Sequence, residues 1–373
     1  MDKVRAHNLI SQAGLGLTGA GVIGAYCICL CAVFNQGVIV ALVCTCIFAL
    51  ASVRRDYIYA PSPLLAVAFF LLLQLESLSL TLISLALGCL ICFVLNKRLK
   101  GIKPPDFVMG GAFIGLALCA TILFTNTYFG IGAFGTTALD MLKSYRSLGF
   151  HPDFRGLLYG TITLFTMITY PFKFRRLRNI IPAEFITILI PFILNLILNP
   201  DAAYTTTNEY FANEAALSMP TSDYATAVRS VLTTASVTGF TLYLLSDKSN
   251  IKKPWTVFSA QPVIPCKKTD YTVFSAATTI IAVAAVTLLA PSLVHRLPLP
   301  CAGAMLIVSA WQHTSFRPLS TTMKQKSVFK LLLLISCGAV FVSLSPDFAI
   351  SFCIMLWVFA ELISRRREAK NDS

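Results

Sequence analysis

Long apolar runs, each ended by charged or turn-forming residues, follow one another along almost the whole chain. Runs of about 20 apolar residues are long enough to cross a bilayer as helices. The pattern therefore predicts an all-α polytopic membrane protein with about 12 spans. The expected spans are residues 9–33, 37–53, 62–74, 78–95, 107–125, 155–172, 182–198, 223–245, 270–291, 298–313, 327–343 and 348–364. Polar loops are expected at residues 126–153 and 199–222.

Two proline-rich breaks interrupt this pattern at matching places in the two halves, at residues 59–63 and 261–265. Proline cannot donate to a helix ladder. Paired breaks of this kind are the sequence mark of discontinuous helices that meet at a transporter's binding site. We expect residues 62–74 to form a half-length helix that directs unpaired N–H groups inward. The alternative is an ordinary proline-capped helix start at the membrane surface.

Composition and charge support the membrane prediction and give it an orientation. The chain is 56% hydrophobic and 13% charged, with a net charge of +13 and a mean hydropathy of +0.73. The basic residues lie in short clusters at the ends of apolar runs, and an even number of expected spans separates successive clusters. The positive-inside rule then predicts a protein of the inner or plasma membrane with both termini on the cytoplasmic side. Because the basic residues are explained in this way, nucleic acid is not expected as a partner. This parity requires that residues 62–74 cross and that residues 254–269 do not cross completely.

Several motifs, taken in order, resemble the SulP (sulfate-permease) family of anion transporters. Leu289-Ala290-Pro291 followed by Leu297-Pro298, Ile181-Pro182-Ala183-Glu184, and the segment from Ile58 to Leu65 are similar to the family's motifs. The resemblance implies an inverted-repeat SulP/UraA-like domain over residues 1–364, with repeats at about 9–198 and 223–364. A short basic cytoplasmic tail, residues 365–373, is expected to follow it, without the family's STAS domain.

The chain departs from this family in its second repeat. Thr241, Leu242 and Tyr243 follow Gly239-Phe240, so no acid stands where the family usually has a carboxylate. We also expect the ninth and tenth helices to be lost or vestigial, which shortens the repeat. The leading expectation is a secondary transporter or exchanger of a small anion (sulfate, chloride, bicarbonate or carboxylate) by alternating access, not an enzyme. The alternatives are a transport-inactive scaffold or partner subunit and, more remotely, a membrane redox subunit. The bilayer is an expected partner, and a homodimer is left open.

The candidate substrate-binding residues lie at the two breaks and within the eighth expected span, residues 223–245. They are Ala60, Pro61, Ser62, Pro63, Leu64, Leu65, Val263, Ile264, Cys266, Lys267, Lys268, Arg229 and Leu242. A cation in a low dielectric attracts an anion strongly, which favours Lys267 and Lys268. Their alternative is a solvated pair at the cytoplasmic surface, and the alternative for Arg229 is a side chain that reaches the interface.

Other motifs carry little chemistry. The 12 cysteines lie mostly inside expected spans, where thiols act as small hydrophobes, so no metal or cofactor is expected. Residues 130–135 match GxGxxG but lack the strand–turn–helix context of a nucleotide site. No catalytic cluster is visible. Gly111-x-x-x-Gly115 predicts a face where two helices pack closely.

Overall fold

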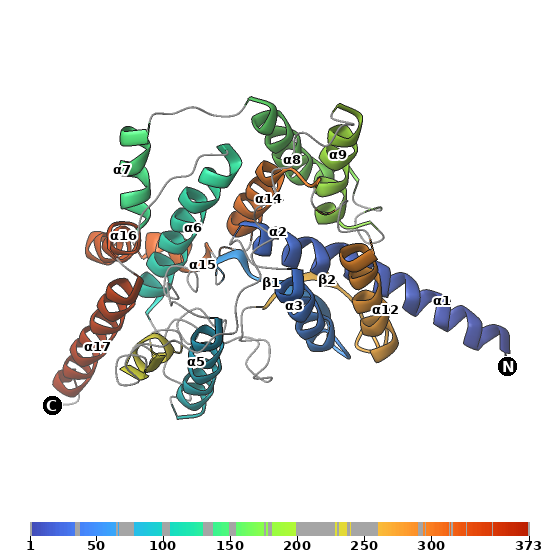
Figure 1. Ribbon diagram of the computed structural model, residues 1–373. Helices are drawn as coiled ribbons and strands as arrows, with labels where there is room; N and C mark the ends of the chain where they lie inside the picture. The colour runs from blue at the N-terminus through green and yellow to red at the C-terminus, as the bar shows by residue number, and fades with distance from the viewer. Residues whose placement is uncertain are drawn as a thin grey trace.

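The structure is a computed structural model (Figure 1). It describes residues 2–33, 38–64, 66, 78–98, 105–129, 137–148, 154–174, 177, 181–198, 228–229, 231–236, 239, 260–289, 294, 296–312, 314, 316–325, 327–344 and 346–371. Its elements are α1 (Asp2–Gly19), η1 (Ala20–Gly24), α2 (Ala25–Val33), α3 (Val38–Ala51), β1 (Tyr57–Pro61), α5 (Leu78–Arg98), α6 (Asp106–Phe129), α7 (Ala138–Leu148), α8 (Phe154–Lys173), α9 (Ala183–Leu198), β2 (Ala260–Pro265), α12 (Val273–Ala284), η5 (Ala285–Leu289), α14 (Leu299–Gln312), α15 (Arg317–Lys324), α16 (Val328–Ser343) and α17 (Pro346–Asn371).

The first expected span is one continuous helix that contains a π-helical turn, η1, between α1 and α2. Its apolar part runs from Leu9 to Val33. Glycines allow α12 to lie directly against it. A Cβ added at Gly16 would lie 2.7 Å from the carbonyl oxygen of Ser275, and one at Gly24 would lie 2.8 Å from Cγ2 of Val283. The small-residue face of α1 and η1 therefore sets the approach of α12.

A two-stranded antiparallel sheet lies near the centre of the view in Figure 1, and it joins segments about 200 residues apart in the sequence. The pairing runs from Tyr57 opposite Pro265 to Pro61 opposite Ala260. Prolines fit here because each strand has only one partner, so a missing N–H costs little on the open side. β1 also contacts α3, η1 and α2.

A second group of helices packs around α6. This helix contacts α14, α15 and α16, and α14 in turn contacts α8. The predicted close-packing face is confirmed, because a Cβ at Gly111 would lie 2.6 Å from the carbonyl oxygen of Leu334 and one at Gly115 would lie 2.7 Å from Cβ of Phe341. α6 and α16 run parallel, because Gly111 lies against Leu334 and Gly115, further along α6, lies against Phe341, further along α16.

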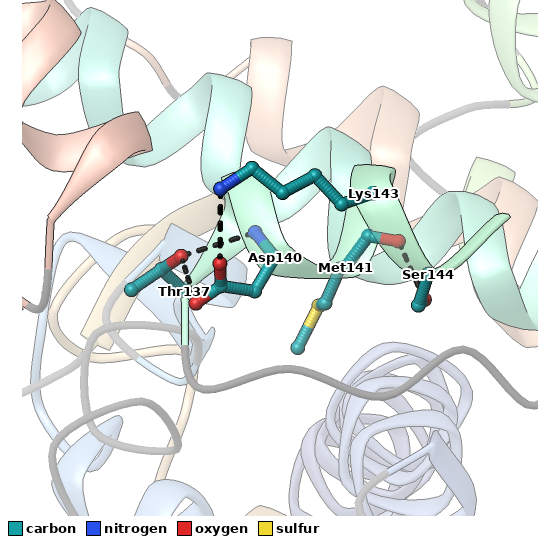
Figure 2. Close-up of polar contacts among 5 residues, drawn as sticks. All are labelled: Thr137, Asp140, Met141, Lys143 and Ser144. Atoms are coloured by element: carbon teal, nitrogen blue, oxygen red, sulfur yellow. Dashed lines mark hydrogen bonds and ion pairs between the residues drawn. The ribbon is translucent and has the colours of Figure 1, made fainter. Parts of the chain in front are cut away.

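The polar loop expected at residues 126–153 is partly wrong, because it contains α7. Figure 2 shows the beginning of this helix: Thr137 Oγ1 accepts a hydrogen bond from the Asp140 N–H (3.1 Å) and donates one to the Asp140 carboxylate (2.8 Å). Lys143 Nζ lies 3.6 Å from the same carboxylate. Ser144 Oγ donates to the carbonyl of Met141. The Thr137 cap and the Lys143–Asp140 ion pair stabilise this helix, whose mean hydropathy is too low to predict a membrane span.

The remaining described helices coincide with expected spans, apart from two additions. α15 is a short helix between the spans that became α14 and α16, and α17 continues to Asn371, through most of the expected tail. Two described helices are long and apolar enough to cross a membrane, and seven shorter apolar helices accompany them. Residues 67–77 and 240–259, which include the rest of the half-length span and the place of the ninth helix, lie outside the described residues.

Candidate functional site

A helix begins inside the protein directly after β1. The carbonyl of Ser62 accepts a hydrogen bond from the Ala66 N–H (2.9 Å), so Ser62 is the N-cap and Pro63 is the first helical residue. Proline suits this position because its fixed φ matches the helix and its missing N–H would be unpaired anyway. The side chains of Ala60, Ser62 and Leu64 are all less than 9% exposed. This helix therefore starts from a buried point and not from the surface.

A buried helix start of this kind is suited to an anion. The first turn of a helix carries unpaired N–H groups and the equivalent of about half a positive charge. Because Pro63 has no N–H, the backbone donor in the first described positions is Leu64, beside the hydroxyl of Ser62. A small anion placed there would receive charge-assisted hydrogen bonds without any metal or cofactor.

The strand pair holds this helix start in place. Tyr59 N–H donates to Ser52 Oγ (2.9 Å), and Ser52 Oγ donates to the carbonyl of Phe48 (2.8 Å), which ties β1 to the end of α3. Ile58 and Ile264 lie opposite each other and are 0% and 6% exposed. The candidates Val263 and Ile264 are thus brought beside β1, although they contribute apolar surface and not hydrogen-bond donors.

Lys267 and Lys268 lie at the other end of the strand pair. Cys266 N–H donates to the carbonyl of Asp56 (2.9 Å), just before β1 begins. Lys268 Nζ lies 3.7 Å from the Asp56 carboxylate, and both side chains are 58% exposed. Ser62 is five residues from Tyr57, the first residue of β1, so at about 3.3 Å per residue roughly 16 Å separates it from this end. The position of both lysines matches the solvated pair that was their alternative interpretation.

The next helix, α12, also begins at this exposed end. The Thr272 hydroxyl accepts a hydrogen bond from the Ser275 N–H, the Ser275 hydroxyl accepts one from the Thr272 N–H, and Thr272 Oγ1 donates to Gln12 Oε1 (3.1 Å). Its first N–H groups are thus capped within the protein. Of the two helices that follow the strands, the one after β1 begins at the buried end of the sheet and α12 begins at the exposed end.

Sequence reasoning missed a polar contact between α2 and α14. The hydroxyls of Tyr26 and Ser309 lie 2.6 Å apart and both residues are 0% exposed. One turn further along, Cys29 Sγ lies 3.9 Å from Met305 Sδ. The available signal was a tyrosine inside an otherwise apolar run, where a buried hydroxyl needs a partner. The neighbouring π-helical turn, a feature often found at functional sites, has no comparable sequence signal.

The other candidates lie away from the strand pair or outside the description. Arg229 is exposed, as is its neighbour Val228 at 57%, which matches the alternative in which the guanidinium reaches the interface. Leu65 and Leu242 lie outside the described residues. No group of three or more His, Cys, Asp or Glu side chains suited to a metal ion occurs in the described part of the chain.

Comparison with known proteins identifies the fold. No protein-family model and no curated protein sequence matches the chain. Among solved structures, the transmembrane domain of a cyanobacterium bicarbonate transporter, BicA, matches with a TM-score of 0.63 at 14% identity, over 92% of this chain and 97% of that one. SLC26A9 matches with a TM-score of 0.65 at 13% identity, over 95% of this chain and 65% of that one.

The murine Slc26a9 anion transporter in the inward-facing state matches with a TM-score of 0.57 at 12% identity, over 94% of this chain and 68% of that one. At these identities the likeness is one of fold. The all-helical polytopic transporter fold implied by the SulP resemblance is therefore confirmed.

Proposed function

We propose that this chain is a secondary transporter or exchanger of a small anion, with its binding site at the start of the helix after β1. The observation that carries the proposal is the buried N-cap at Ser62, placed beside a strand pair in a fold shared with a bicarbonate transporter and an anion transporter. A helix start buried in this way has little structural purpose, because its N–H groups would otherwise lose their hydrogen bonds to water.

The charge at this site favours a small monovalent anion. The helix start offers about half a positive charge, and Lys267 and Lys268 lie at the far end of the sheet. Chloride, bicarbonate or a small carboxylate therefore suits it better than sulfate, whose second charge would have to be desolvated with neither Lys267 nor Lys268 beside it. Within the range of anions that the resemblance implies, sulfate is the least favoured by this geometry.

Transport would proceed by movement of one helix group against the other. The first group contains α1, η1, α2, α3, α12 and the strand pair, and the second contains α6, α14 and α16. They meet where α2 touches α14, through Tyr26–Ser309 and Cys29–Met305. One hydrogen bond and a thioether contact are weak enough to break and re-form during alternating access.

The test is anion-dependent flux into liposomes that contain the purified protein. Ser62→Trp fills the helix start with a bulky ring and should abolish flux. Ser336→Trp is the matched control, because this half-buried α16 serine donates an exposed hydrogen bond to the carbonyl of Leu332 in its own helix and is far from the strand pair in sequence. Flux in Ser62→Trp equal to that of the unmodified protein would remove the proposed site.

A transport-inactive scaffold is the second candidate, and one observation favours it. The helix that follows the second break, α12, begins at the exposed end of the sheet and is capped, so it does not add a second helix start opposite Ser62. Purified protein that shows neither anion flux nor an anion-dependent rise in thermal stability would support this alternative. A saturable rise in stability with chloride or bicarbonate, lost in Ser62→Trp, would support the transporter.

A further inference from the structure

A stretch of the chain without acidic residues surrounds α15. Between Asp270 and Asp347 the sequence contains no Asp or Glu, while Arg317, Lys324 and Lys330 are all exposed. Lys330 Nζ donates to Gln325 Oε1 (2.7 Å) across the joint between α15 and α16, which orders one of its three N–H groups and leaves the other two free. The positive charge of this region is thus not balanced by any acid of its own segment.

The helix packing places α15 at one end of the bundle. α15 contacts α6, and α16 runs parallel to α6, so the first residues of α16 lie at the end where α6 begins. The preceding helix, α5, finishes with Lys97 and Arg98 in its last turn, before α6 begins at Asp106. This is the basic end of the molecule, which the positive-inside rule assigns to the cytoplasm.

Large apolar side chains are exposed beside these cations. Phe316 is 45% exposed, Met323 is 60% exposed and Val328 is 71% exposed. The ring of Phe316 stacks on that of Trp311, with centroids 6.0 Å apart and an interplanar angle of 6°. On its other side the helix is anchored, because Thr322 is only 1% exposed. A short helix with cations, exposed apolar side chains and one buried face is typical of the membrane–water interface.

We propose that α15 and the first turn of α16 form a binding surface for anionic phospholipids, with Arg317 and Lys324 at the phosphate. Charge complementarity selects an anionic group, and the neighbouring Phe316, Met323 and Val328 select one that carries acyl chains. A soluble phosphate would satisfy the cations but would leave these apolar side chains in water. The inference depends on membrane insertion and is independent of the proposed anion transport.

The experiment uses native mass spectrometry to compare the binding of different lipids to the purified full chain in detergent. The probes are phosphatidylglycerol, phosphatidylcholine and, as a soluble headgroup, glycerol 1-phosphate. The test variant Arg317→Gln/Lys324→Gln removes two exposed cations from the surface. The control variant Lys97→Gln/Arg98→Gln removes two exposed cations from the last turn of α5, at the same end of the molecule.

Each cation near an anionic headgroup contributes about 1 kcal/mol, or roughly fivefold in affinity, so the test variant should bind phosphatidylglycerol about 25-fold more weakly at low salt. The control should change by less than about threefold, and phosphatidylcholine should bind weakly to all three proteins. Met323→Ser should also weaken phosphatidylglycerol binding, through the acyl contact. Equal losses in the two double variants, or equal binding of glycerol 1-phosphate and phosphatidylglycerol, would overturn the proposal.

Discussion

Replacing Gly111 by alanine should separate α6 from α16. A Cβ at this position would lie 2.6 Å from the carbonyl oxygen of Leu334 and still closer to Cβ of Cys337. Neither atom can rotate away, because one belongs to the backbone and the other is the first atom of its side chain. The two helices must therefore move apart along a face that also includes Gly115 and Gly338, and the contacts on both sides of it loosen.

The size of the effect follows from two opposing contributions. Forcing a methyl group into a packed interface costs about 1–3 kcal/mol. Alanine in place of glycine within a helix returns about 1 kcal/mol, through its lower backbone entropy in the unfolded chain. The net loss for Gly111→Ala should then be about 0–2 kcal/mol of unfolding free energy relative to the unmodified protein, and about 1–3 kcal/mol relative to a glycine-to-alanine change without a clash.

The chain offers a matched control for the propensity contribution. Gly14 lies within α1, and a Cβ added there meets nothing within 4 Å. Thermal unfolding in detergent should therefore show Gly14→Ala at or slightly above the unmodified protein, and Gly111→Ala clearly below Gly14→Ala. If Gly111→Ala is as stable as Gly14→Ala, the close approach of α6 and α16 is not a feature of the protein in solution.

Three further changes test other parts of the structure. Tyr26→Phe and Ser309→Ala each remove the buried hydrogen bond between their hydroxyls, at about 0.5–1.5 kcal/mol, and a double-mutant cycle read by thermal unfolding should show non-additive losses. Burial raises the pKa of Tyr145 to about 12, whereas a tyrosine in an unfolded chain has a pKa of roughly 10. The contribution of Tyr145 to the unfolding free energy is therefore complete below about pH 10 and falls as the pH rises towards about 12. Over that range the Tyr145→Phe variant should lose less stability than the unmodified protein. Lys267→Gln/Lys268→Gln should leave the anion affinity in flux assays within about twofold, since both residues follow the end of the strand pair that lies roughly 16 Å from the helix start, and a tenfold loss would contradict this geometry.

The sequence was most informative where the cause of structure is local. The apolar run that predicted a span at residues 9–33 coincides with the apolar helix Leu9–Val33. Gly111 and Gly115 predicted close packing because only the smallest side chain permits it. The proline at position 63 predicted a helix start, and the hydrogen bond between Ala66 and Ser62 agrees with it. In each case the residue types close together in the sequence favour the structure that forms.

Hydropathy was less informative where a helix is polar or its pairing is remote. α7 was missed because charged and hydroxyl residues are interspersed among its apolar positions and lower its mean hydropathy, although Ala138 and Met141, which are buried, and Tyr145 follow a helical spacing. The contact between Tyr26 and Ser309 joins residues 283 apart, and nothing in the sequence near either residue names the other. Such contacts depend on how whole helices pack, which a single sequence does not encode locally.

The direction of a strand decides what a repeated motif can build. The sequence contains two proline breaks and suggests that the residues after each one, Ser62–Leu64 and Cys266–Lys268, converge on one site. The breaks do pair, but an antiparallel pair sends its two following segments to opposite ends of the sheet. What lies beside Pro61 across the pair is Ala260, the beginning of β2. A second wall for the anion must therefore come from residues that precede the second break or from another helix. The order of the motifs alone points instead to the residues that follow the second break, which lie at the other end of the sheet.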